Sequence, residues 1–254
     1  MISSRGGECD KIGDSKRRER EEFLEIIDEI TLCNFRHLLE EHGLNKLFFD
    51  AINRVMVETG HMMKGGAIVD ATIIDAPSST KNAEKKREPE MHSAKKGNQW
   101  RFGMKCPAGV DAGTGYVHRI EVTAANVHDV TVASGLIRED DEVVYADSAY
   151  LGLEKRTEVV NDEHLSSIEY RVNLRPSRFP KVSDNAIDWT RWIEKRKSSV
   201  RCKVEHIFRI IKCQFGYRKT RYRSLKKNGN RLYAMFACAN LYLLAMAGRR
   251  LREA

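Results

Sequence analysis

The sequence has no closely spaced cysteine pair, no apolar run near its start and no internal repeat. Its six cysteines are scattered, and none belongs to a C-x-x-C pair. This spacing argues against a structural zinc site and against a disulfide framework, and it indicates a reduced, cytosolic compartment. The first 30 residues are charged and do not resemble a signal peptide.

One apolar stretch, Leu232–Ala247, is the single candidate for a membrane segment in the sequence. It is 16 residues long and contains Asn240. A helix of that length is too short to cross a bilayer comfortably. The stretch therefore predicts a buried helix near the C-terminus and no membrane partner.

Basic residues outnumber acidic residues, and the basic excess is distributed unevenly along the chain. Lys and Arg number 44 against 36 for Asp and Glu, which gives a net charge of +8 over 254 residues. The excess is concentrated between Tyr170 and Arg231, where acids are few. Such a tract favours a polyanionic partner, although many basic proteins bind none. The length allows one large domain, or one domain plus a small one, with a real core.

The first half of the chain changes from helical to strand periodicity. Helices are predicted over 31–39, with Thr31 as the cap, and over 44–56. Alternation with period two then predicts a strand over 67–75. A polar, lysine-rich connection follows over 77–98, and a β-hairpin of 100–110 and 116–123 is predicted around the glycine-containing loop 111–115.

The second half alternates between strands and helices. The predicted elements are a helix over 129–136, a strand over 142–147, a helix from about 151, a strand over 167–174, a helix over 200–212 and a final helix over 233–246. Adjacent strands followed by alternation predict an α/β fold. Its mixed sheet would be flanked by helices, as in ribonuclease-H-like folds, and preceded by a small helical N-terminal segment.

Acidic residues occur at unusual places in three of these elements. Asp70 lies in the middle of an apolar strand, where an acid is costly to bury without a partner. Asp147 ends a short apolar strand just before a helix, a common place for a functional group in α/β sheets, although it also suits a helix cap. Glu205 borders the apolar stripe of its helix, which alone fits an ordinary amphipathic helix. Asp111 is explained by turn chemistry.

Three carboxylates from distant parts of the chain would suit Mg²⁺ or Mn²⁺, which prefer hard oxygen ligands. Two such ions ~4 Å apart can activate a nucleophile and stabilise the leaving oxygen in phosphoryl transfer. Basic surroundings would hold a nucleic-acid backbone. Periodicity alone does not show that the three acids meet.

Several runs closely resemble one protein family, the DDE transposases of bacterial insertion sequences, and most closely the insertion-sequence-five group. They are residues 66–82, 89–100, 123–129, 145–152 and 204–217, in the family's order. The resemblance extends from about residue 29 to the C-terminus. It implies a ribonuclease-H-like catalytic core that uses Mg²⁺, with Mn²⁺ as an alternative. That core would cleave DNA at terminal inverted repeats and join the ends to a target.

The resemblance also assigns roles to single residues. Asp70, Asp147 and Glu205 correspond to the three metal-binding catalytic acids of the family. Its Y-x2-R-x3-E-x6-K pattern places Arg201 and Lys212 at DNA phosphates near the scissile bond. The tyrosine of that pattern is replaced by Ser198 in this chain, and the glycines that usually flank the second acid are replaced by Ala146 and Ala149.

Further DNA contacts are expected from the basic tract and one aromatic residue. Arg175, Lys219, Arg221 and Arg223 belong to the tract and are expected to bind DNA. Trp100 is a candidate for stacking on a flipped base, with a core or hairpin role as the alternative.

The resemblance implies two segments and one function. Residues 1–62 form a charged leader and a helical segment, shorter than the family's N-terminal region that helps to recognise transposon ends, and 63–254 form the catalytic domain. The predicted protein is a transposase that acts as a homodimer on double-stranded DNA in a bacterial cytoplasm. One alternative is a catalytically impaired, DNA-binding remnant. Another is a simple ribonuclease-H-like nuclease, which the basic tract disfavours.

Overall fold

The computed structural model describes residues 28–81, 83, 85–179 and 188–253. The chain divides into two compact units, 1–44 and 45–254. The predicted charged leader, 1–22, lies outside the described residues.

Two helices form the predicted helical N-terminal segment, α2 (Glu29–Glu41) and α3 (Leu44–Glu58). The cap of α2 is Asp28 rather than Thr31, because Asp28 Oδ1 accepts the backbone N–H of Thr31 at 2.6 Å. The side chain that satisfies the first turn therefore comes from three residues earlier than the sequence suggested. α3 buries Phe49 and Met56 in the apolar clusters of the larger unit.

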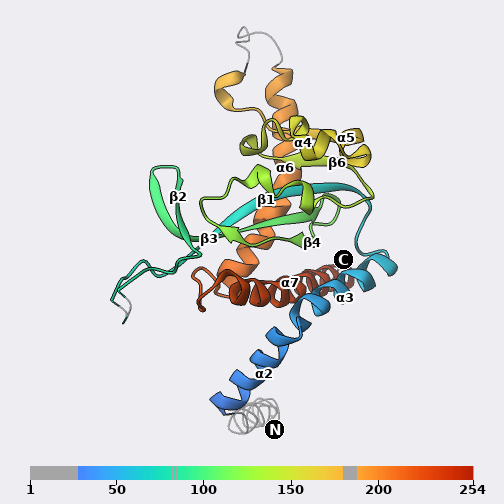
Figure 1. Ribbon diagram of the computed structural model, residues 1–254. Helices are drawn as coiled ribbons and strands as arrows, with labels where there is room; N and C mark the ends of the chain where they lie inside the picture. The colour runs from blue at the N-terminus through green and yellow to red at the C-terminus, as the bar shows by residue number, and fades with distance from the viewer. Residues whose placement is uncertain (1–27, 82, 84, 180–187, 254) are drawn as a thin grey trace, which may run out of the picture. The chain divides into compact units, whose positions relative to one another are not determined.

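Seven strands form one mixed sheet (Figure 1). Its order is β2-β3-β1-β6-β7, with β4 and β5 pairing with β3. β1 is antiparallel to β3 and parallel to β6, which is parallel to β7. These pairings confirm the predicted α/β class and are consistent with a ribonuclease-H-like fold. The strands are β1 (Gly65–Asp75), β2 (His92–Lys96), β3 (Gln99–Asp111), β4 (Val117–Ile120), β5 (Thr123–Ala124), β6 (Asp141–Ala146) and β7 (Glu169–Val172).

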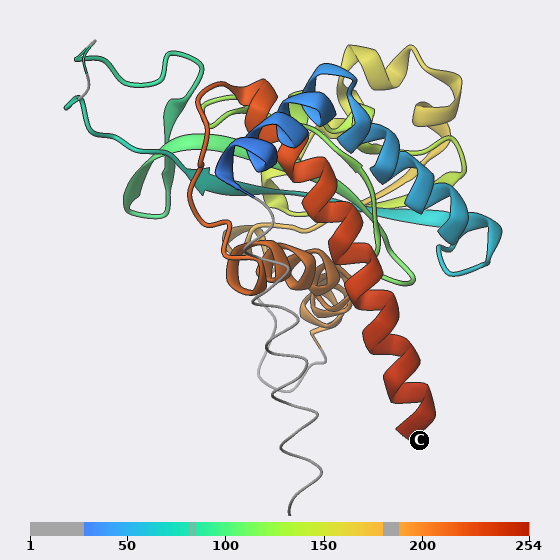
Figure 2. The same cartoon turned by 90° about the horizontal axis from the view of Figure 1, so that it is seen from below.

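Three further local predictions were wrong. The helix predicted from about 151 is instead a 3-10 turn, Leu153–Lys155, and a four-residue helix, Thr157–Val160. β2 lies within the segment predicted to be a polar connection, and it forms with β3 a hairpin that projects from the rest of the sheet (Figures 1 and 2). The α-helix predicted over 129–136 is instead two 3-10 turns, η1 (Asp129–Thr131) and η2 (Ser134–Leu136). β-Branched residues at 130–132 and the pair Ser134-Gly135 lower helix propensity, so the segment forms turns.

The remaining helical elements follow β6. They are η3 (Ser148–Tyr150), η4 (Leu153–Lys155), α4 (Thr157–Val160), α5 (Glu163–Ser167), η5 (Pro176–Arg178), α6 (Trp189–Arg209), the π-helical η6 (Ile210–Gln214) and α7 (Leu225–Glu253). α6 and α7 both extend beyond the ranges predicted for them.

The two faces of the sheet pack against different apolar clusters. On β1, Ala67 and Val69 belong to the cluster completed by the turns and helices between β5 and β7. Ile68 and Ile74 belong to the cluster built with α6 and α7. Because side chains alternate along a strand, Asp70 points to the same face as Ile68, the face that α6 crosses (Figure 1).

α7 is anchored to the sheet by a fully buried asparagine. Asn240 donates to the carbonyl of Val117 at 2.8 Å and accepts its N–H at 2.9 Å, and it also donates to Asn53 Oδ1 at 2.9 Å. By length and composition alone, α7 is apolar enough to cross a membrane. The contacts of Asn240 and the buried side chains of Leu232 and Phe236 show that α7 packs against the rest of the larger unit.

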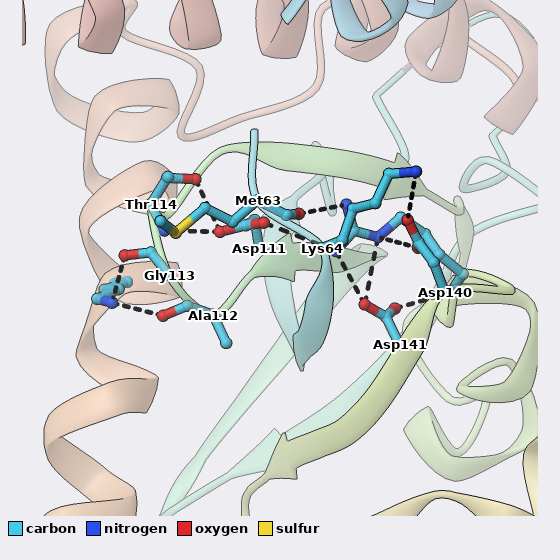
Figure 3. A network of polar contacts seen from close by, with 10 residues as sticks. Met63, Lys64, Asp111, Ala112, Gly113, Thr114, Asp140 and Asp141 are labelled. Carbon is cyan, nitrogen blue, oxygen red and sulfur yellow. Dashed lines mark hydrogen bonds and ion pairs between the residues drawn. The ribbon is translucent and has the colours of Figure 1, made fainter. Parts of the chain in front are cut away.

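A network of charges fixes the strand ends remote from Asp70 (Figure 3). The guanidinium of Arg138 lies 2.8 Å from Asp141 at the start of β6 and 3.6 Å from Asp111 at the end of β3. It also donates to the carbonyl of Met63, just before β1, at 3.1 Å. Asp111 Oδ1 accepts the N–H of Thr114 at 2.6 Å, which agrees with the turn role expected for this acid.

Candidate active site

Two of the three predicted acids lie side by side. Val69 of β1 pairs with Ala146 of the parallel strand β6. The next residues along these strands are Asp70 and Asp147, so the two aspartates lie at the same level on chains about 4.8 Å apart. The strand register therefore brings them together, although they are far apart in sequence.

The carboxylate of Asp70 is mostly buried, with 19% of its side chain exposed. Oδ1 accepts the N–H of Ala71 at 2.7 Å, and Oδ2 lies 3.3 Å from Nη2 of Arg201. Burial raises the pKa of Asp70 to about 6, and the charge of Asp147 adds to that rise, while Ala71 and Arg201 oppose it. The carboxylate is thus ionised at neutral pH at a cost in free energy, which a bound cation would reduce.

Asp147 caps the 3-10 turn that follows β6. Its Oδ1 accepts the N–H of Ala149 at 2.7 Å. The cap role, the alternative interpretation of this residue, is therefore present in the structure. It involves one oxygen of the carboxylate and is compatible with a second role for Asp147.

A buried tyrosine lies close to the two aspartates. Tyr150 is 1% exposed, and its hydroxyl has no hydrogen-bond partner among the described residues. Burial raises the pKa of Tyr150 well above its usual value, and the charges of Asp70, Asp129 and Asp147 raise it further. Arg201 opposes this rise, so acids and a cation both act on one buried hydroxyl. No sequence pattern had singled out Tyr150.

Arg201 connects α6 to the sheet at the acidic pair. Besides its contact with Asp70, its Nη1 donates to Oδ1 of Asn173, just after β7, at 3.1 Å. Asn173 is 7% exposed and donates in turn to Oε2 of Glu194 at 2.8 Å. Arg201 thus lies beside Asp70, its predicted contact with DNA stays a prediction, and its partner Asn173 was not predicted from the sequence.

Glu194 is a buried acid at the start of α6, with 6% of its surface exposed. It accepts the N–H of Leu174 at 2.9 Å and the ammonium of Lys197 at 2.8 Å, in addition to Asn173. Burial opposes its ionisation, but Lys197, Asn173 and Leu174 together leave the pKa of Glu194 lowered. The one available signal was spacing, because Glu194, Lys197 and Arg201 recur at three and four residues along one helix face.

Glu205 does not join the two aspartates in this structure. It is exposed on α6, one turn beyond Arg201. Over residues 28–253, apart from the gaps given above, no three His, Cys, Asp or Glu side chains are grouped closely enough to hold a metal ion. The assignment of Glu205 as the third acid therefore stays a prediction.

The pair Asp70 and Asp147 nevertheless fits a divalent cation. Mg²⁺ is usually held by one or two carboxylates together with water and substrate phosphates, rather than by an all-protein cage. The two side chains supply hard oxygen ligands, and the guanidinium of Arg201 already lies beside one of them. The donor set therefore suits a divalent cation whose remaining ligands are water and phosphate oxygens.

The residues predicted to bind DNA lie in several parts of the structure. Lys212 is half-buried in η6. Burial is the largest cause that lowers the pKa of Lys212, and the nearby cations Lys96 and Arg101 lower it further. Trp100 is 71% exposed at the β2–β3 hairpin, so a core role for it is excluded. The four residues of the basic tract that were predicted to bind DNA are all exposed, namely Arg175, Lys219, Arg221 and Arg223.

Two comparisons relate this chain to known proteins. The family model described as "Transposase DDE domain" matches residues 61–241. A solved structure described as the piggyBac transposase synaptic complex with hairpin DNA is similar, with 12% sequence identity and a TM-score of 0.41. That match covers 70% of this chain and 46% of the piggyBac chain, so the chain spans less than half of that protein's length.

Proposed function

Because the chain belongs to the transposase DDE domain family, we propose that it cleaves DNA strands at the terminal inverted repeats of an insertion sequence. It then transfers the ends to a target in a reaction that depends on Mg²⁺. In this proposal the protein acts as a homodimer on double-stranded DNA in a bacterial cell. The observation that carries this proposal is the register of β1 and β6, which aligns Asp70 with Asp147.

The proposal gives each of the site residues a role. Asp70 and Asp147 hold the cation, and Glu205 approaches from α6 when DNA is bound. Bound there, Mg²⁺ would polarise the scissile phosphate and favour deprotonation of the attacking water or hydroxyl. Arg201, with one donor group on Asn173, directs its positive charge at Asp70 and at any phosphate beside it.

A cleavage assay tests this proposal. The substrate is a supercoiled plasmid that carries the DNA flanking the gene, incubated with Mg²⁺. The variant Asp147→Asn keeps an oxygen for the N–H of Ala149 and so preserves the cap. We expect it to lower the rate of strand cleavage by about 10²-fold or more, the scale of losing an electrostatic group in a transition state. Cleavage at the wild-type rate would exclude Asp147 from the chemistry.

A second candidate function is DNA binding without chemistry. It is favoured by the exposure of Glu205 and by the lack of a three-acid group in the described residues. A strand-transfer assay with Mn²⁺ as well as Mg²⁺ separates the two candidates. Transfer that is abolished by Glu205→Ala, with DNA binding retained, supports the transposase. DNA binding with neither cleavage nor transfer under any of these conditions supports the remnant.

A further inference from the structure

We propose that the sugar-phosphate backbone of duplex DNA docks in a basic groove at the start of α7. This groove, of about 530 Å³, lies between residues of 77–81 and 86–91 on one side and 220–223 on the other. Five cations line it, namely Lys81, Lys86, Arg87, Arg221 and Arg223. The choice of DNA as the ligand rests on the proposed function, whereas the groove itself is a feature of the structure.

Two acids at the groove accept hydrogen bonds from the start of α7. Glu88, the one acid among the described residues that line the groove, accepts the N–H of Ser224 at 3.3 Å. Glu90 nearby accepts the N–H of Leu225 at 2.5 Å. These carboxylates satisfy the N–H groups at the start of α7, where negative charge is favoured by the helix dipole. Among the described residues that line the groove, five cations outnumber one acid, and this excess of positive charge suits an anionic ligand.

One wall of the groove is held in place by a buried side chain. Asn228 has no exposed surface, and it donates to the carbonyls of Tyr222 and Ser224 at 2.8 and 2.7 Å. Its Oδ1 accepts the hydroxyl of Tyr217 at 2.6 Å. Ser224 has a φ of 67°, a conformation rare for residues other than glycine. Such conformations persist where surrounding contacts enforce them, so the turn that carries Arg221 and Arg223 is formed in advance of binding.

Arginine side chains near the groove stack on aromatic rings, which holds both sides of the groove in place. Arg231 donates to the hydroxyl of Tyr222 at 2.8 Å, and its guanidinium lies 5.6 Å from the centre of that ring. Across the groove, Arg87 donates to the carbonyl of Ser78 at 3.1 Å and lies 5.3 Å over the ring of Phe102. Arginines held in this way lose little entropy when they bind a phosphate, and their planar groups suit bidentate contacts.

The groove is connected to the strand that carries Asp70. Thr220 donates to the carbonyl of Asp75 at 2.8 Å, and Lys219 forms a β-bridge with Asp75. Asp70 precedes Asp75 by five residues on β1, a distance of about 16 Å along the strand. This corresponds to about five base pairs of duplex at 3.4 Å each. A single duplex can therefore contact both the acidic pair and the basic groove.

The test measures DNA binding without divalent metal, in EDTA, by fluorescence anisotropy with a labelled duplex of about 30 base pairs. The variant is the double change Arg221→Ala and Arg223→Ala. Its matched control is Lys46→Ala and Lys155→Ala, which removes the same charge from exposed positions outside the groove. Thermal unfolding confirms that both variants fold.

We expect the groove variant to bind about tenfold or more weakly than wild type at 0.15 M salt. The slope of log K against log [salt] should fall in magnitude by about 1.8, because two phosphate contacts are lost. The control should bind within about twofold of wild type, with an unchanged slope. An affinity and slope for the groove variant equal to those of the control would overturn the inference. A defect with single-stranded DNA alone, leaving duplex binding intact, would also overturn it.

The two experiments distinguish an error in the DNA-binding role of the groove from an error in the proposed function. Cleavage that depends on Asp147, together with normal duplex binding by the groove variant, contradicts the groove alone. Cleavage that is insensitive to Asp147→Asn, together with weakened duplex binding by the groove variant, contradicts the proposed chemistry and supports the groove.

Discussion

Nη2 of Arg201 lies 3.3 Å from Oδ2 of Asp70, so α6 places a cation beside the buried carboxylate of β1. This contact couples the charge state of Asp70 to the position of α6. A divalent cation that binds Asp70 and Asp147 would compete with the guanidinium for the same oxygen. Because Arg201 also donates to Asn173, it keeps one partner when it leaves the carboxylate.

The free energy of unfolding should depend on the charge of Asp70. Its folded pKa of about 6 exceeds the usual 3.8, so the stability it contributes is present below pH 3.8 and is lost as pH rises through about 6. At pH 7.5 the loss is on the order of 2–3 kcal/mol. Asp70→Asn should therefore raise the Tm at pH 7.5 and leave it near the wild-type value at pH 4. A lower Tm for the variant at pH 7.5 would contradict this effect of burial.

Removal of Arg201 should shift the pH dependence of metal binding. Arg201 lowers the pKa of Asp70, so Arg201→Ala should raise that pKa above about 6. Loss of the guanidinium also removes the cation that competes for Asp70, and doubly charged Mn²⁺ gains more from this than a proton does. The pH at which Mn²⁺ binding is half-maximal should therefore move downward, and Asn173→Ala should move it less in the same direction. The measurement is Mn²⁺ binding followed by electron paramagnetic resonance between pH 5 and 8, with exposed Arg191→Ala as the control. A midpoint unchanged by Arg201→Ala would show that the contact does not act on Asp70.

His118 should make the protein sensitive to acid. It is 8% exposed, and neither ring nitrogen has a hydrogen-bond partner among the described residues. Burial lowers the pKa of His118 well below 6.5, and the cations Arg138 and Arg119 lower it further. Its contribution to stability is thus present above pH 6.5 and is lost as pH falls below that value, at up to about 1.4 kcal/mol per pH unit.

The matching experiment replaces His118 by Phe and follows urea unfolding from pH 7.5 to 5. The difference in free energy of unfolding between variant and wild type should grow in favour of the variant as the pH falls. Exposed His92→Gln serves as the control and should not alter the pH profile. A constant difference between His118→Phe and wild type across this range would show that His118 does not titrate on unfolding.

Asn240 should be essential for the packing of α7. Replacement by Leu would leave the N–H and carbonyl of Val117 buried without their partner. Unpaired buried groups cost about 1–3 kcal/mol each, so Asn240→Leu should lower the free energy of unfolding by about 2–4 kcal/mol. Urea denaturation measures the loss, with exposed Cys238→Ala as the control. Equal or higher stability for Asn240→Leu would mean that α7 packs through its apolar contacts alone.

The sequence predicted the position of a strand where the apolar residues of that strand form one clear pattern. The alternation across 67–75 located β1 and singled out Asp70, and a short apolar run that ends on an acid located β6 and Asp147. β2 was missed because its Lys-rich sequence carries no apolar alternation, and its pairing with β3 comes instead from the turn at Gly97, with a φ of 60°. Strand pairing of this kind depends on the partner strand, which local pattern does not describe.

The residues that surround Asp70 and Asp147 were harder to predict from the sequence. Family resemblance assigned Arg201, but the buried partners Asn173 and Glu194 lie on different elements and meet only through tertiary packing. The basic groove combines residues about 135 positions apart, as the contact between Ser224 and Glu88 shows. No residue spacing encodes such a contact.

The most direct test of the acidic pair is calorimetric titration of Mn²⁺ into the metal-free protein at pH 7.5, with wild type and Asp147→Asn compared. Asp162→Asn is the matched control, since Asp162 also caps a helix, through the N–H of Leu165 at 2.8 Å, and is exposed. Wild type and the control should bind Mn²⁺ with the same affinity, and Asp147→Asn should bind at least about tenfold more weakly. Undiminished binding by Asp147→Asn would contradict a metal site formed by Asp70 and Asp147.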